Sequence, residues 1–131
     1  MISYPVYKLV HIIGIVLAMS ALGGAALLAM VGAYDTPVAG GRSPRRLLAI
    51  LHGLGAFLIL LGGFGMLARL GIVQGGITNF PGWLLVKIAV WVVVAGALFL
   101  PRRQPGLARP LLLALPVLGG LAAYMAIFKP F

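Results

Sequence analysis

The chain has 131 residues, of which 63% are hydrophobic and only 8% are charged, and its mean hydropathy is +1.17. An ordinary soluble domain is about 45–50% apolar and about 25% charged. The composition therefore excludes a soluble domain with a polar surface and indicates an integral membrane protein. The net charge of +9 comes from ten Lys and Arg residues against one acid, Asp35, and there is no cysteine. Paired-carboxylate catalysis, thiolate chemistry and disulfides are therefore excluded.

Four apolar segments follow one another along the chain, and each is long enough to cross a bilayer, which takes about 20 residues. They cover 6–33, 47–70, 82–100 and 107–128. The connections between them are short and contain Pro and Gly, so consecutive helices should be antiparallel neighbours. The sequence therefore predicts a single all-α domain over 1–131, an integral membrane four-helix bundle with up-down topology.

The distribution of Lys and Arg predicts how this bundle lies in the membrane. Six basic residues lie in or beside the first and third connections, and three lie at the opposite ends of the spans. Because positively charged loops stay in the cytoplasm, we expect both termini on the outer, periplasmic side of a bacterial inner membrane. Cations in short loops beside apolar runs also favour contact with the lipid bilayer over binding of nucleic acid. The six are Arg42, Arg45, Arg46, Arg102, Arg103 and Arg109, and the three are Lys8, Arg69 and Lys129.

His11 is the first polar residue of interest, because an ionisable side chain at membrane depth is costly and marks a candidate functional site. Gly14 and Ala18 follow it on the same helical face. A face without bulky side chains would allow a flat porphyrin to approach the imidazole. Two alternatives stay open: the small residues can pack against a neighbouring helix, which we favour for the stripe itself, and His11 can be an interfacial histidine bonded to a backbone carbonyl.

Lys87 lies five or six residues into the third span, four residues before Trp91 on the same helical face. Such a lysine can reach the headgroups, or it can ligate a metal when burial makes its amine neutral. His52 lies at a similar distance into the second span, which runs opposite to the first. At 1.5 Å per residue, His52 should be about 20 Å from His11 along the membrane normal. The predicted metal ligands are therefore His11 and Lys87, which enter the lipid in the same direction at similar depth.

A family resemblance rests on five short motifs that cover all four spans: YKLVH at 7–11, LH at 51–52, LILLGG at 58–63, GWLLVK at 82–87 and YMAIFKP at 124–130. With these motifs the chain resembles two families of small four-helix membrane proteins, the SirB-type proteins and the HemJ-type protoporphyrinogen oxidases. The HemJ-type resemblance implies that His11 and Lys87 hold b-type haem. The SirB-type resemblance adds a histidine in the second span, which is His52 here.

Two classes of function follow as expectations. In the first, the protein binds b-type haem or another porphyrin and acts in electron transfer, with quinone or a protein partner, or in tetrapyrrole redox chemistry. If it is an enzyme, the resemblance implies a tetrapyrrole oxidoreductase. In the second, it is a non-catalytic accessory subunit of a larger respiratory or photosynthetic membrane complex, or a homo-oligomer, because it is small and rich in helix-packing glycines. The expected cofactor contacts are His11, Lys87, Gly14, Ala18, His52 and Trp91.

Overall fold

A computed structural model describes residues 1–38 and 40–131 of the chain. This part of the chain is helical without any β-strand, and it has the four helices, long and apolar enough to cross a membrane, that the sequence predicts. The third of them continues from α3 through a 3-10 turn into α4, and the fourth includes the 3-10 turn before α5. The elements are α1 (Tyr4–Met30), α2 (Arg45–Arg69), α3 (Gly82–Gly96), α4 (Leu100–Arg103) and α5 (Ala108–Phe128), with 3-10 turns at Ile77–Asn79, Ala97–Phe99 and Pro105–Leu107.

Glycines in the left-handed conformation end the first two helices. Gly32 has φ +71°, and the amide of Ala33 after it donates to the carbonyl of Leu28 at 2.8 Å. Gly71, with φ +72°, ends α2 through the same pattern of hydrogen bonds. This arrangement satisfies backbone carbonyls that the last helical turn leaves free, and only glycine adopts it without steric cost. As a result, α1 ends at Met30, three residues before the expected end of the first span.

α1 and α2 are antiparallel and pack with their backbones in contact. A Cβ atom on Gly55 would lie 2.5 Å from the amide nitrogen of Ala18, and a Cβ on Gly62 would lie 2.5 Å from that of His11. Gly14, in the same interface, faces the backbone of α2 at Ile59. Small residues allow this approach, and close van der Waals packing is what drives helix association in lipid. The small-residue stripe of α1 is therefore occupied by α2.

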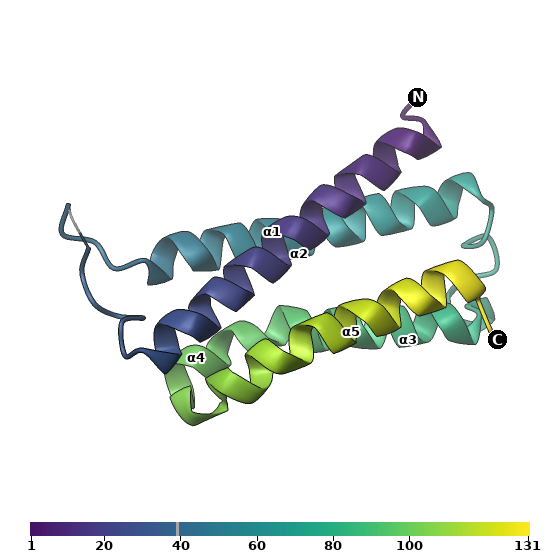
Figure 1. Cartoon of the computed structure of the whole chain (residues 1–131). Helices are drawn as coiled ribbons and strands as arrows, with labels where there is room; N and C mark the ends of the chain where they lie inside the picture. Colours follow the sequence, from purple (N-terminus) through teal and green to yellow (C-terminus); the bar gives the residue numbers. More distant parts are fainter. Residues whose placement is uncertain (39) are drawn as a thin grey trace.

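The other two long helices, α3 and α5, pack against each other and against α1. An apolar core joins these three helices near α4, at the end of the molecule opposite the two termini (Figure 1). Toward the ends marked N and C, α1 and α5 lie farther apart (Figure 1). The bundle is thus closed at one end and looser at the other. The core near α4 consists of Leu22, Ala26, Val90, Val94, Ala97, Ala108, Leu111 and Leu115.

Candidate functional site

A cavity of about 530 Å³ lies in the looser half of the bundle, and all four long helices contribute to its walls. This volume is within the range of about 300–1,000 Å³ that is usual for sites that bind small molecules and cofactors. Most of the lining is apolar, and it extends from Tyr4 and Leu70 near the termini to Val94 and Gly119 in the middle of the bundle. Such a cavity suits a largely apolar ligand held by a small number of polar groups.

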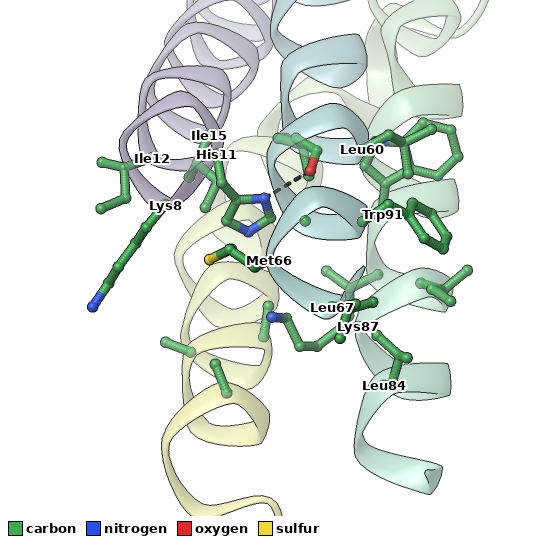
Figure 2. Close-up of a pocket in the computed structure, with 18 of the residues that line it drawn as sticks. Lys8, His11, Ile12, Ile15, Leu60, Met66, Leu67, Leu84, Lys87 and Trp91 are labelled. Carbon is green, nitrogen blue, oxygen red and sulfur yellow. Dashed lines mark hydrogen bonds between the residues drawn. The ribbon is translucent and has the colours of Figure 1, made fainter. Parts of the chain in front are cut away.

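His11 projects from α1 into this cavity (Figure 2). Its Nδ1 atom lies 2.7 Å from the backbone carbonyl oxygen of Ile59 on α2. Because a carbonyl only accepts hydrogen bonds, Nδ1 is the donor, and in the neutral imidazole Nε2 keeps a lone pair. Figure 2 shows this second nitrogen directed toward the region of Met66 and Lys87. A histidine whose Nδ1 donates to a carbonyl while Nε2 is free has the arrangement that metal-ligating histidines commonly have.

Gly63 makes room for the imidazole on the surface of α2. A Cβ atom at this position would lie 3.4 Å from both Cε1 and Nδ1 of His11, which is closer than most side chains pack. Gly63 is also one helical turn after Ile59, so its amide is the intrahelical donor to the carbonyl that His11 reaches. The glycine therefore exposes a backbone acceptor that a larger side chain would crowd.

Lys87 lines the same cavity from α3, so the structure brings together the two residues predicted as metal ligands. Figure 2 shows its side chain extending across the cavity toward α5. The ammonium nitrogen lies 6.0 Å from the centre of the Trp83 ring, within the range of a cation–π interaction. Lys87 therefore has a partner within the protein and also presents a polar group to the cavity.

Trp91 also lines the cavity, one turn after Lys87. Its indole nitrogen donates to the backbone carbonyl of Ala56 at 3.0 Å, so the side chain connects α3 to α2. This bond satisfies the polar edge of the ring. The indole therefore offers the cavity mainly an apolar surface.

Gly14, Ala18 and His52 lie at the interface between α1 and α2, outside the cavity lining. His52 is only 2% exposed. Its Nδ1 lies 3.1 Å from the carbonyl oxygen of Ala18, and its Nε2 lies 3.2 Å from that of Ala95 on α3. Both ring nitrogens are therefore occupied by backbone groups, and the imidazole links three helices. A cofactor contact of these three residues stays a prediction, and the geometry of His52 favours a structural role.

The structure adds cavity residues that the sequence alone did not reveal as neighbours of His11. The sequence places Trp83 and Lys129 in two of the family motifs, and Lys129 in the count of charges, but it does not indicate that both line the cavity. Met66, on α2, lines it as well and lies near His11 in Figure 2. The antiparallel order of the spans indicates that Lys129 and Trp83 are close, because it places the end of the fourth span beside the start of the third.

The positive charge of the cavity has no balancing carboxylate among its lining residues, which include Lys8, Lys87 and Lys129. The one acid of the chain, Asp35, follows the other end of α1 and pairs with Arg45 at 3.0 Å.

Comparisons of the chain with protein-family models, with curated proteins and with solved structures found no match. The geometry of the cavity is therefore what supports a function.

Proposed function

We propose that the protein is an integral membrane protein that binds b-type haem in this cavity, with His11 as an axial ligand of the iron, and acts in electron transfer or tetrapyrrole redox chemistry. The observation that carries this proposal is the hydrogen bond of 2.7 Å from His11 to the Ile59 carbonyl. It fixes the tautomer of the imidazole, so that Nε2 offers its lone pair to the cavity.

The residues of the cavity fit a haem group in three respects. The imidazole is a preferred ligand of iron, the apolar walls match the faces of a porphyrin, and the lysines match its acidic propionates. Lys87 has two possible roles in this arrangement, as the second axial ligand or as a contact of a propionate. Trp91 and Leu84, whose side chains belong to the apolar walls, would then cover the ring and exclude water from it.

Bound haem supplies one-electron redox chemistry, and the protein adjusts its potential through the axial ligand, hydrogen bonds and burial. In this chain the Ile59 carbonyl makes His11 a stronger electron donor by polarising its Nδ1–H bond. The apolar lining would exclude water from the bound group and keep it in surroundings of low dielectric constant. The backbone contact of α1 with α2 keeps the imidazole in place relative to that carbonyl.

We also propose that the bundle has up-down topology in a bacterial inner membrane, with both termini in the periplasm. Arg45, at the start of α2, and Arg102 and Arg103, in α4, are at the end of the helices that this orientation places in the cytoplasm. The cavity then opens toward the periplasmic leaflet. Alkaline phosphatase fused after the last residue should be active, and an inactive fusion beside a fluorescent cytoplasmic fusion would reverse the orientation.

The decisive experiment is an absorption spectrum of the protein purified in mild detergent after expression with a haem precursor. We expect a Soret band and a reduced-minus-oxidised difference typical of b-type haem. His11→Gly should remove this band, and added imidazole should restore it by occupying the vacated space. A protein that is folded, as judged by size-exclusion chromatography, but has no Soret band at any stoichiometry would refute the proposal.

A second experiment separates electron transfer from tetrapyrrole oxidation. The gene is introduced into a bacterial strain that lacks protoporphyrinogen oxidase, beside the His11→Gly variant as a control. Growth without added haem, dependent on His11, would favour the enzymatic role. Failure to grow despite a haem-loaded protein would leave electron transfer as the function.

A further inference from the structure

We propose that Lys87 and Lys129, together with Trp83, form a binding site for the carboxylates of the ligand in the cavity, and that Lys87 does not coordinate the metal. This inference rests on the proposed function, in which the carboxylates are the two propionates of haem. It assigns Lys87 to one of its two possible roles, and it adds Lys129 and Trp83 to the site. The iron then has one ligand from this chain, His11.

Two ammonium groups converge on one indole ring at the cavity. The Nζ atoms of Lys87 and Lys129 lie 6.0 and 5.5 Å from the centre of the Trp83 ring. They are therefore no farther apart than the sum of these two distances. All three residues line the cavity, and the Trp83 side chain is buried. The indole thus holds two positive charges beside the same space.

The position of Lys129 is fixed by the chain around it. Lys129 ends α5 in the left-handed conformation, with φ 46°, and its amide donates to the carbonyl of Met125. Two residues later, the carbonyl of Phe131 accepts a hydrogen bond of 2.8 Å from the amide of Trp83. The ring of Phe131 lies against Gly82, where a Cβ atom would collide with it. Residues 129–131 are therefore attached to the start of α3, the helix that carries the indole.

The lysines around the indole have no acidic side chain to pair with among the described residues. No Asp or Glu lines the cavity, and Asp35, the single acid, pairs with Arg45 beyond the other end of α1. Two like charges near a surface of low dielectric constant repel each other, and a carboxylate between them removes that repulsion. Because the two propionates of haem leave the same edge of the ring, one ligand can supply a carboxylate to each lysine.

The same contacts oppose a role for Lys87 as a metal ligand. An amine coordinates a metal only through a neutral nitrogen with a free lone pair. A cation–π interaction with Trp83 and a bond to a carboxylate both require the charged ammonium. The structure shows Lys87 within reach of the indole. A carboxylate held between Lys87 and Lys129 would therefore keep Lys87 in the charged form, which has no lone pair for iron.

The test uses metal-free protoporphyrin IX, which has both propionates but no iron, and its dimethyl ester, which has neither charge. Each is titrated into the purified protein in detergent, and binding is followed by porphyrin fluorescence. We expect the diacid to bind about tenfold more tightly than the ester, a difference of about 1.4 kcal/mol. Lys129→Gln should remove most of this preference, whereas Arg69→Gln, a control at the end of α2 outside the cavity lining, should keep it.

Equal affinity for the diacid and the ester, or equal weakening of both by Lys129→Gln, would overturn the inference, as would the absence of any porphyrin binding. Displacement of the diacid by oleate at a lower concentration than by haem would assign the site to a fatty acid instead. Because the probe lacks iron, these results are independent of His11. A protein without a Soret band that still prefers the diacid would refute only the proposed function.

Haem-loaded protein supplies the readout on the metal. If His11 is the one protein ligand, ferric haem should have the same spin state in the unmodified protein and in Lys87→Gln. A low-spin spectrum with the magnetic circular dichroism of histidine–amine ligation, lost in Lys87→Gln and kept in Lys129→Gln, would show that Lys87 is an axial ligand and would contradict the inference.

Discussion

The two histidines of this protein lie in two differently packed halves of the bundle. His52 is in the closed half, where both of its ring nitrogens meet backbone carbonyls and its side chain is 2% exposed. His11 is in the looser half, where one ring nitrogen meets a carbonyl and the other lies at a cavity. The same residue type, in contact with the backbone in both places, therefore has both ring nitrogens against carbonyls in one half and one ring nitrogen facing a cavity in the other.

This contrast separates a structural histidine from a candidate ligand. Position along the predicted spans does not distinguish them, because both lie at a similar distance from the start of a span and both side chains reach a neighbouring helix. The number of ring nitrogens left without a backbone partner does distinguish them.

The largest effect is expected from His52→Ala. It removes a buried side chain whose two ring nitrogens both lie within hydrogen-bond distance of backbone carbonyls, and it opens a void among three helices, so the free energy of unfolding should fall by about 2–4 kcal/mol. His11→Ala should lower it by about 1 kcal/mol or less, because the Ile59 carbonyl keeps its intrahelical bond. The measurement is unfolding in mixed detergent micelles, followed by circular dichroism. Equal destabilisation by the two variants would remove the distinction between the halves.

The next effect concerns the backbone contact between α1 and α2. Gly55→Ala places a methyl group 2.5 Å from the amide nitrogen of Ala18, so the helices must separate. We expect a loss of about 1–3 kcal/mol in the same unfolding experiment, as for other overpacked interfaces. Gly53→Ala is the matched control, because a Cβ there has no atom within 4 Å, and it should cause no loss. If both variants were equally stable, close packing would not hold this pair together.

The four helices could be predicted from the sequence because their existence depends on the length and hydrophobicity of each segment. The presence of His11 and Lys87 in one cavity could also be predicted, since two spans that run in the same direction bring residues at equal distances from their ends to similar positions along the bundle. The carbonyl groups that decide the roles of His11 and His52 could not. Every residue has a carbonyl, so the sequence does not indicate that those of Ile59 and Ala95 face an imidazole.

Lys129 shows a second limit of the sequence. Its place beside Trp83 depends on residues 129–131 folding back onto the start of α3, through a backbone hydrogen bond and the contact of Phe131 with Gly82. Both are tertiary contacts between short segments of ordinary composition. The helix ends were predicted only within a few residues, because a single glycine in the left-handed conformation decides where α1 ends.

An intermediate effect is expected from Trp91→Phe, which keeps an aromatic ring in the cavity wall but removes the hydrogen bond to Ala56. The free energy of unfolding should fall by about 1 kcal/mol, the usual contribution of one such bond. Tryptophan fluorescence then reports Trp83 alone, since the chain has two tryptophans. Quenching of that emission by added haem would place the bound group near Trp83, and its absence would contradict a ligand in this cavity.

The smallest effect is expected from Gly63→Ala, which alters the looser half without touching the closed one. The new methyl group would lie 3.4 Å from Cε1 and Nδ1 of His11, so the imidazole must shift by a few tenths of an ångström while its hydrogen bond to Ile59 persists. Haem affinity should fall by about threefold, equivalent to about 0.7 kcal/mol, with the free energy of unfolding of the haem-free protein unchanged. Equilibrium titration with haem, followed at the Soret band, measures the affinity. A large loss of stability together with unchanged affinity would mean that Gly63 serves helix packing, as Gly55 does, and that the surroundings of His11 are no freer than those of His52.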